Sequence, residues 1–318
     1  MYSYFKFKLI VCWFPGDHMT TPIWQQSLFE WRLQLVRRIP HQTHIGGGEK
    51  DPDIRGMSYN SARDELFLAD WNNNVVRALH LRDSADEMRD VYKTPHGASP
   101  IVWCVCQLSD SDTLLVCLEE KGPDKKLAYW LVALSRNGSE WRETQRMQTE
   151  GLGWICCALS DSRVLIGQWL STFMELFRVE SGPRIERVHR LDVPEEYDWF
   201  SATCGSDTLV AMTYPYTDQS VRVYRQSGHR LEELTRIDMK NPKSVMWLAD
   251  RLLVADWDDE KESHAVIELK LSGTRIERRR ELIANTENIG VGRWCAVNEG
   301  LAIFDYKSKE TLHYSFRN

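Results

Sequence analysis

The stretch Asp64-Glu65-Leu66-Phe67-Leu68-Ala69-Asp70-Trp71 decides the fold, because related sequences return five more times along the chain. The counterparts of its apolar run begin at Leu114, Val164, Leu209, Leu252 and Leu301. The spacings between successive runs are 48, 50, 45, 43 and 49 residues. A repeat of this length indicates an array of similar structural units rather than two unrelated domains.

A second feature of the repeat is a residue pair that lies four and five positions after the start of each run. The six pairs are Asp70-Trp71, Leu118-Glu119, Gln168-Trp169, Thr213-Tyr214, Asp256-Trp257 and Asp305-Tyr306. Glu119 is the exception, and the other five pairs end in an aromatic residue. One register position therefore carries a large ring in most units, which supports the repeat.

Each unit is predicted to contain four antiparallel strands. A polar turn such as 109–112 separates a first apolar segment from the second, and a further strand follows the aromatic residue. Asn137-Gly138, Ser227-Gly228 and Ser272-Gly273 precede a fourth strand, and glycine supplies the positive φ that tight hairpins require. Four antiparallel strands per repeat are typical of a propeller blade. The sequence therefore predicts an all-β fold, a six-bladed β-propeller.

The last unit ends after its third strand, so its outer strand must come from elsewhere. Residues 30–36 have a strand-like pattern before the first full unit and would close the ring while covering a free edge. We expect a disordered leader over residues 1–28 and a single propeller over 29–318. The expected blades cover approximately 53–99, 100–151, 152–198, 199–244, 245–290, and 291–318 plus 29–40.

Composition limits the classes of partner. The formal charge is −6, and no long block of Lys or Arg accumulates, so we expect no nucleic-acid partner. The basic run 278–280 is flanked by acids and is predicted to lie on an outer strand as a solvated edge. No apolar run is long enough to span a bilayer, so no membrane partner is expected. We expect a monomer.

Eight cysteines show no C-x-x-C pair and no zinc-like spacing. Most of them lie within apolar strand patterns, where a free thiol packs as a small hydrophobic group. This predicts a cytoplasmic protein. The alternative is a secreted protein, if residues 1–18 act as a signal peptide.

The segment Leu66–Arg77, with Ala69-Asp70-Trp71 followed by three Asn residues, resembles six-bladed propellers of the NHL, YWTD and TolB-like kind. The resemblance implies a binding platform for proteins or sometimes RNA. Some relatives are calcium-dependent hydrolases with an acidic, Asn-rich ion site. The expected inner-strand starts here are apolar or aromatic, as at 101–103, 153–155 and 199–201, and calcium needs oxygen ligands. We therefore expect no metal and no cofactor.

The candidate binding residues lie where second strands end and where inner strands begin. They are Trp71, Trp169, Tyr214, Trp257, Tyr306, Asp70, Asp256, Trp103 and Trp154. The aromatic residues could form a collar for a protein or peptide. The acidic segments 194–198 and 256–260 suggest that this partner is basic. In the competing interpretation, the rings pack between blades and the aspartates cap their own turns.

The preferred function is a non-enzymatic scaffold that binds a protein or peptide on one face of the propeller. No Gly-x-Ser-x-Gly elbow, phosphate-binding loop or His-Glu-x-x-His motif is present, so no catalytic residue is predicted. The alternative is a metal-dependent hydrolase, of the lactonase or esterase kind, with its site at the mouth of the central channel.

Overall fold

The computed structural model describes residues 32–41, 50–82, 88–94, 100–108, 111–122, 124–160, 162–168, 171–180, 184–193, 201–206, 209–248, 251–272, 275–286, 293–298 and 300–317. The expected leader over residues 1–28 lies outside these ranges. Within them the regular structure consists of strands. In the part of the chain so described, no helix is long and apolar enough to cross a membrane.

The strands are short and follow one another closely along the chain. In order they are β1 (Arg32–Pro40), β2 (Ile54–Asn60), β3 (Glu65–Asp70), β4 (Val75–His80), β5 (Met88–Lys93), β6 (Ile101–Gln107), β7 (Thr113–Lys121), β8 (Leu127–Asn137), β9 (Glu140–Thr149), β10 (Gly153–Ser160), β11 (Arg163–Gln168), β12 (Phe173–Glu180), β13 (Arg184–Asp192), β14 (Ser201–Ser206), β15 (Leu209–Tyr214), β16 (Ser220–Ser227), β17 (Arg230–Asp238), β18 (Pro242–Leu248), β19 (Arg251–Asp258), β20 (Ser263–Ser272), β21 (Arg275–Thr286), β22 (Trp294–Val297), β23 (Gly300–Asp305) and β24 (Glu310–Arg317).

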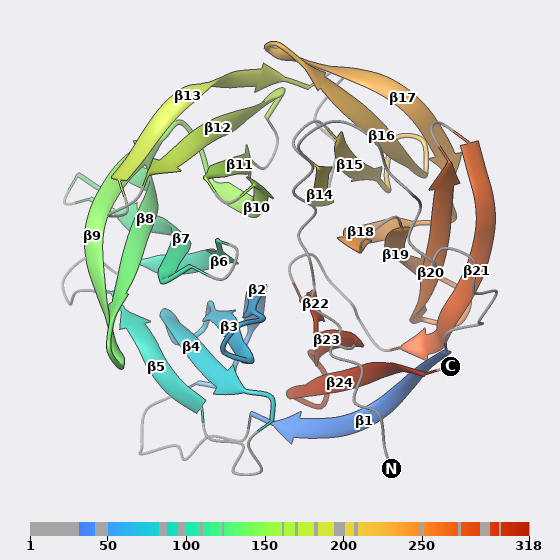
Figure 1. The fold of residues 1–318 in the computed structure, drawn as a ribbon, viewed down its shortest axis with the longest axis horizontal. Helices are drawn as coiled ribbons and strands as arrows, with labels where there is room; N and C mark the ends of the chain where they lie inside the picture. Colours follow the sequence, from blue (N-terminus) through green and yellow to red (C-terminus); the bar gives the residue numbers. More distant parts are fainter. Residues whose placement is uncertain are drawn as a thin grey trace, which may run out of the picture.

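The strands pair in groups of four that surround a central axis (Figure 1). We number these groups as units one to six, namely β2–β5, β6–β9, β10–β13, β14–β17, β18–β21, and β22–β24 with β1. Within each unit neighbouring strands are antiparallel, and the first strand lies innermost (Figure 1). Units three and four also share one parallel bridge, between Asp192 of β13 and Arg230 of β17.

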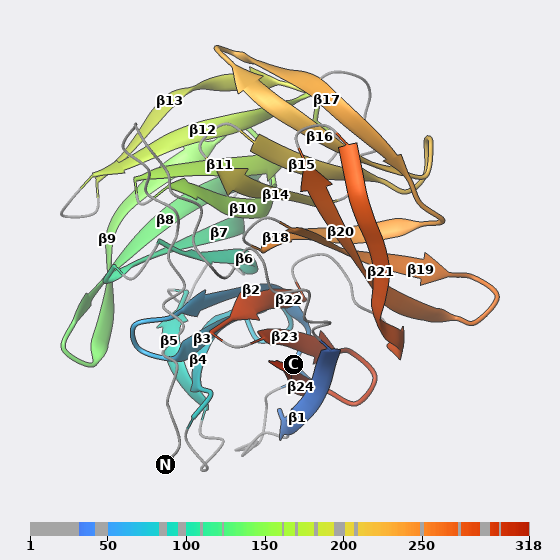
Figure 2. The same cartoon turned by 45° about the vertical axis from the view of Figure 1, so that its right-hand side comes forward.

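The N-terminal strand completes the sixth unit. β1 pairs antiparallel with β24 from Arg32 opposite Arg317 to Pro40 opposite Glu310, with an irregularity at Val36. The two ends of the described chain therefore lie side by side in both views (Figures 1 and 2). A strand from one end of the chain covers the edge that the other end would leave open.

The core lies between neighbouring units rather than in one central mass. Each hydrophobic cluster in the described residues joins two units that are adjacent in the ring. In one of them Phe67 and Ala69 of β3 pack with Val105 of β6 and Val116 of β7. All six residues of β3 are buried. A strand covered on both faces becomes continuously apolar, which is why the second strand of each unit gave such a clear sequence signal.

Local geometry agrees with two features predicted from the sequence. Gly138 and Gly228 adopt φ values of 64° and 59° in the turns before β9 and β17, as predicted for these hairpins. The basic run 278–280 lies on β21, which is the outermost strand of unit five, also as predicted. The inner strands β2 and β6 approach so closely at Gly56 that a larger residue would not fit. A Cβ atom at this position would lie 2.8 Å from the Cα of Cys104.

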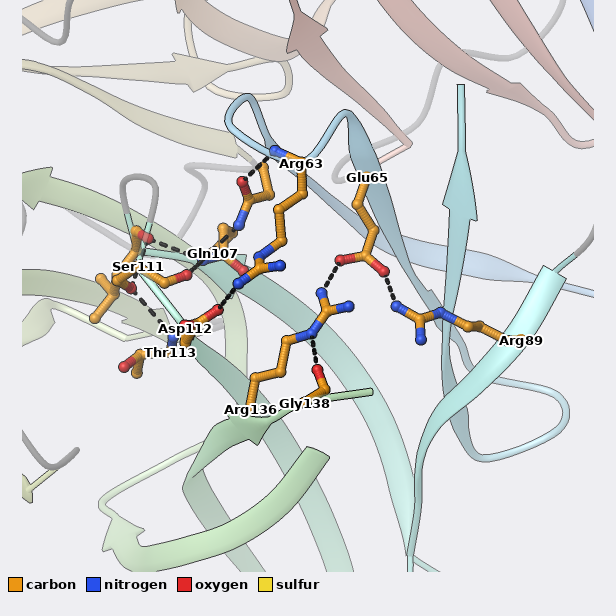
Figure 3. Close-up of polar contacts among 11 residues, drawn as sticks. Arg63, Glu65, Arg89, Gln107, Ser111, Asp112, Thr113, Arg136 and Gly138 are labelled. Carbon is orange, nitrogen blue, oxygen red and sulfur yellow. Dashed lines mark hydrogen bonds and ion pairs between the residues drawn. The ribbon is translucent and has the colours of Figure 1, made fainter. Parts of the chain in front are cut away.

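A buried carboxylate connects units one and two. Glu65 of β3 is fully buried, and Nη1 of Arg136 from β8 donates to its Oε2 at 2.8 Å. Arg89 of β5 donates to the other carboxylate oxygen. Figure 3 shows Glu65 between these two guanidinium groups, with the Arg63–Asp112 ion pair (2.8 Å) beside them. Two cations and the hydrogen bonds that they donate offset the cost of burying this charge.

Candidate functional site at one face of the ring

The Asp-Trp pair of unit one fixes the chain segment that enters the inner strand. The side chain of Asp70 accepts a hydrogen bond from the backbone N–H of Asp53 at 3.2 Å. The backbone N–H of Trp71 donates to the backbone carbonyl of Asp53 at 2.9 Å. Asn73 and Arg77 also contact the Asp70 carboxylate. Burial raises the pKa of Asp70, and these donors act in the opposite direction.

The pair of unit five repeats this arrangement. Asp256 accepts the backbone N–H of Asn241 at 2.7 Å, and the backbone N–H of Trp257 donates to the Asn241 carbonyl at 3.0 Å. The indole N–H of Trp257 donates to Asp259 at 2.7 Å, and its ring packs against His264. Because Asp70 and Asp256 bind the backbone in the same way, their recurrence follows from the repeated fold.

Among the residues that the structure describes, a bulge recurs at the start of four inner strands. In β2, Ile54 pairs with Asp70 and Gly56 pairs with Ala69, so Arg55 is an extra residue without an opposite partner. The same irregularity, at the same position relative to the second strand, occurs in β6, β10 and β18. The extra residues are Arg55, Trp103, Trp154 and Lys243. Such bulges redirect a side chain and are frequent beside functional sites.

Three indoles form a continuous row across units one to three. The ring centroids of Trp71 and Trp103 are 6.1 Å apart, and those of Trp103 and Trp154 are 5.1 Å apart. The guanidinium of Arg55 lies 5.4 Å from the centroid of Trp71. All four side chains are half-buried. We call Trp71, Trp103 and Trp154 the tryptophan row.

A charged group lies next to the row, where unit six meets unit one. Asp53 is buried and accepts hydrogen bonds from Arg55 at 2.7 Å and from Arg293 at 3.0 Å. Arg293 also lies over the ring of Tyr306, 4.8 Å from its centroid, and Lys309 lies over the same ring at 3.4 Å. The group therefore contains one carboxylate and three cations, and two of these cations, Arg293 and Lys309, lie over the exposed ring of Tyr306.

The structure unites two sets of candidates that the sequence treated separately. Trp71 was predicted among the aromatic residues that follow second strands. Trp103 and Trp154 were predicted among the residues where inner strands begin. Trp257 contacts His264 and Asp259 within its own unit. Trp169 lies outside the described residues.

Tyr214 does not lie where the collar predicted it. Its side chain is buried, and its hydroxyl is 2.7 Å from that of Tyr224 on the neighbouring strand. Arg222 lies over the ring at 4.4 Å. Burial raises the pKa of Tyr214, as expected for a phenol inside the core. The ring therefore packs inside unit four and offers no exposed surface to a partner.

Sequence reasoning missed Arg55, Lys243 and Arg293. The four bulged residues lie 15, 15, 14 and 13 positions before the first residue of the recurring pair in their own unit, namely Asp70, Leu118, Gln168 and Asp256. The distances differ because the hairpin between the first and second strands differs in length between units. A fixed repeat spacing therefore does not reveal them. Arg293 was hidden for a different reason, since its role depends on Asp53, which is 240 residues away in sequence.

A metal centre would require several ligands close together. Across the described ranges, no group of three or more His, Cys, Asp or Glu side chains is placed to hold a metal ion. The acidic side chains at this face instead bind the chain's own donors, as Asp53 does with Arg55 and Arg293.

Comparisons with known proteins give the fold. No family model matches the chain, and no curated protein matches it. The Swd1 β-propeller domain from Myceliophteria thermophila is similar over 82% of each chain, with a TM-score of 0.53 and 9% identity. The fold is a β-propeller.

Two further solved structures have this likeness over most of their length. A chain of a mitotic checkpoint complex matches 97% of this chain and 100% of its own, with a TM-score of 0.62 and 9% identity. The soluble aldose sugar dehydrogenase from Escherichia coli matches 91% of this chain and 99% of its own, with a TM-score of 0.56 and 8% identity. At such identities the likeness shows the propeller fold alone.

Proposed function

We propose that this propeller is a non-enzymatic scaffold that binds a protein or peptide through one face. The observation that carries the proposal is the tryptophan row, in which the ring of Trp103 lies between those of Trp71 and Trp154 from the two neighbouring units. Tryptophan is strongly enriched among the residues that dominate binding energies at protein interfaces. A row of them gives one propeller face an apolar anchor for an extended segment.

The row is positioned before any partner arrives. Trp103 and Trp154 belong to inner strands, and Trp71 is tied to the crossover segment through its backbone N–H. Rings held by their neighbours lose little conformational freedom on binding, so more of the contact energy remains as affinity. This pre-organisation distinguishes the row from isolated surface tryptophans.

Charge at the same face would orient the partner. We keep a basic partner as our proposal: its cations would meet Asp259 and Glu260, which are exposed beside Trp257 in unit five, and not the cationic group of Arg55, Arg293 and Lys309 beside the row. Asp258, by contrast, already lies within 3.2 Å of Lys240 and 3.6 Å of Lys261. Electrostatic attraction of this kind increases association rates and weakens as salt rises.

The fold neighbours are compatible with this proposal without deciding it. They include a chain of a protein complex and an enzyme, so a propeller can serve either role. The closer resemblance to NHL, YWTD or TolB-like propellers, the blade boundaries and the cytoplasmic location all remain proposals that rest on the sequence.

Affinity capture with matched tryptophan variants tests the proposal. Trp71→Ala and Trp154→Ala remove the ends of the row, whereas Trp141→Ala removes an indole of β9 that packs against Phe67. The partner is identified with the wild-type protein and its affinity for each folded variant is then measured. We expect both row variants to bind at least ten-fold more weakly and Trp141→Ala to bind normally. Equal affinities for all four proteins would contradict the proposal.

The hydrolase alternative predicts a different result. A calcium-dependent enzyme would be stabilised by its ion, so its melting temperature would rise with calcium and fall with a chelator. It would also hydrolyse lactones or esters only with the ion present. A scaffold predicts no change in either measurement, so thermal melts with calcium and with chelator separate the two functions.

A further inference from the structure

Four units place a cysteine at the same register of the inner strand. Each cysteine pairs with the second residue of the apolar run that defines the repeat. The pairs are Cys106 with Leu115, Cys157 with Leu165, Cys204 with Val210 and Cys295 with Ala302. Inner strands lie nearest one another around the axis (Figure 1), so small side chains suit this position.

Two of these thiols are in direct contact. The Sγ atoms of Cys157 and Cys204 are 3.0 Å apart, although the residues are separated by 47 positions in sequence. Cys157 belongs to β10 of unit three and Cys204 to β14 of unit four. Both side chains are half-buried, as is that of Cys156, whereas Cys104, Cys106, Cys117 and Cys295 are buried.

We propose that Cys157 and Cys204 are an oxidisable pair that a peroxide converts into a disulfide between units three and four. A disulfide bond is about 2.05 Å long, so the sulfur atoms must approach by roughly 1 Å. A change of this size requires only a small movement of each side chain. The pair joins equivalent register positions of β10 and β14, two inner strands that contact each other between units three and four.

The chemistry balances with a peroxide as the oxidant. The thiolate of one cysteine attacks a peroxide oxygen, which breaks the O–O bond and gives a sulfenic acid and one water after protonation. The sulfur of the second thiolate then attacks the sulfenic sulfur. The S–S bond forms as hydroxide leaves and is protonated to a second water. The pair loses two electrons and two protons in total, and the peroxide accepts them.

The surroundings of the pair set the rate of this reaction. The hydrogen bond with Cys204 and burial together raise the pKa of the Cys157 thiol. Because the thiolate is the reactive form, oxidation should be slow at neutral pH and accelerate as the pH rises. The contact between the two sulfur atoms favours closure to the disulfide once the first sulfur has been oxidised.

The disulfide would connect the inner strands of units three and four, whose outermost strands are already joined by a backbone bridge. The parallel bridge between Asp192 and Arg230 links β13 to β17. The new bond would close a loop between two residues that are 47 positions apart in sequence. This loop reduces the conformational entropy of the unfolded chain. We expect the melting temperature to rise by roughly 5 °C on oxidation and to return to its original value with reductant.

Peptide mapping of the full chain after hydrogen peroxide treatment tests the proposal. Free thiols are alkylated, the protein is digested, and cross-linked peptides are identified by mass spectrometry. We expect one major link, between the peptide that contains Cys156 and Cys157 and the peptide that contains Cys204. Cys157→Ala should abolish this link, whereas Cys156→Ala, which changes the adjacent residue, should retain it.

Two further results bear on the same proposal. Cys295→Ala removes the equivalent cysteine of unit six and should leave both the link and the melting shift unchanged. A link that persists in Cys157→Ala, a dominant link among other cysteines, or fully alkylated Cys157 and Cys204 in the oxidised wild type would overturn the proposal. Mapping of the wild type alone gives a decisive result, even if a variant does not fold.

Discussion

Trp103 and Trp154 hold their ring centroids 5.1 Å apart although they belong to different units of the propeller. Each is the extra residue of a bulge at the start of its inner strand. Two bulges at the same register therefore turn equivalent side chains toward each other across the interface. The contact depends on a departure from regular pairing that recurs with the repeat.

This contact predicts an energetic coupling. Adjacent aromatic rings contribute about 1 kcal/mol beyond the area that they bury, so Trp103→Ala and Trp154→Ala should be non-additive by that amount. The measurement is a double-mutant cycle from urea unfolding. Trp103→Ala combined with Trp141→Ala serves as the control, because Trp141 packs against Phe67, and it should be additive within about 0.5 kcal/mol. Equal coupling energies in both cycles would mean that the contact between Trp103 and Trp154 adds no stability of its own.

The second prediction concerns the buried ion pair in Figure 3. Glu65→Gln removes a charge that Arg136 and Arg89 neutralise, and leaves two guanidinium groups without their carboxylate. We expect the free energy of unfolding to fall by about 3 kcal/mol. Glu140→Gln is the matched control, because its pair with Arg142 is mostly exposed and should change stability by less than about 1 kcal/mol. Urea denaturation measures both.

A loss at Glu65→Gln no larger than that of the control would show that the buried pair adds nothing to the contact between units one and two. The double variant Glu65→Leu with Arg136→Met provides a second test. It removes one cation together with the carboxylate, so it should be less destabilised than Glu65→Gln.

The strands of this fold were predictable because each second strand is covered by two neighbouring units. Burial on both faces produces the continuous apolar run Leu66–Ala69 within β3, and the same requirement repeats it in every unit. Hairpin glycines such as Gly228 were predictable from their local backbone alone. These features depend on short-range physics that one sequence records directly.

The site was less predictable because it depends on register and on distant partners. Arg55 and Trp103 become equivalent only through bulges, and hairpins of different length hide that equivalence in the sequence. Tyr214 shares the register of Trp71 but is turned inward to meet the hydroxyl of Tyr224. A pattern assigns a residue to a position, whereas the direction of its side chain depends on the neighbouring unit.

The third prediction tests how the ring closes. Ile39 of β1 is fully buried in the cluster between units six and one, whereas Val36 on the same strand is 50% exposed. Ile39→Ala should therefore destabilise the whole propeller by about 3 kcal/mol, because it leaves a cavity where β1 closes the ring. Val36→Ala should change stability by less than about 0.5 kcal/mol. Chemical unfolding followed by fluorescence measures both. Similar values for the two variants would contradict a structural role for β1.

The last prediction concerns two buried histidines that stay neutral in the folded protein. Burial, with a smaller effect from Arg77, lowers the pKa of His41 to about 3. Burial also lowers the pKa of His264 to about 4, with smaller effects from Lys243 and Arg293. Both groups have an ordinary value of 6.5 when the chain unfolds. At pH values between the folded-state pKa and 6.5, each histidine therefore binds a proton in the unfolded state but not in the folded state.

The sign of the pH dependence follows from that difference. Stability from these groups is fully present above about pH 6.5 and is lost as the pH falls toward 4, by up to about 1.4 kcal/mol per pH unit for each histidine. His41→Gln keeps a polar side chain opposite Thr311, which His41 contacts at 2.6 Å, but removes the titration. Urea unfolding at pH 7, 6 and 5 should show the wild-type advantage over His41→Gln shrinking as the pH falls. An advantage that stays constant over this range would mean that His41 accepts its proton equally well in both states.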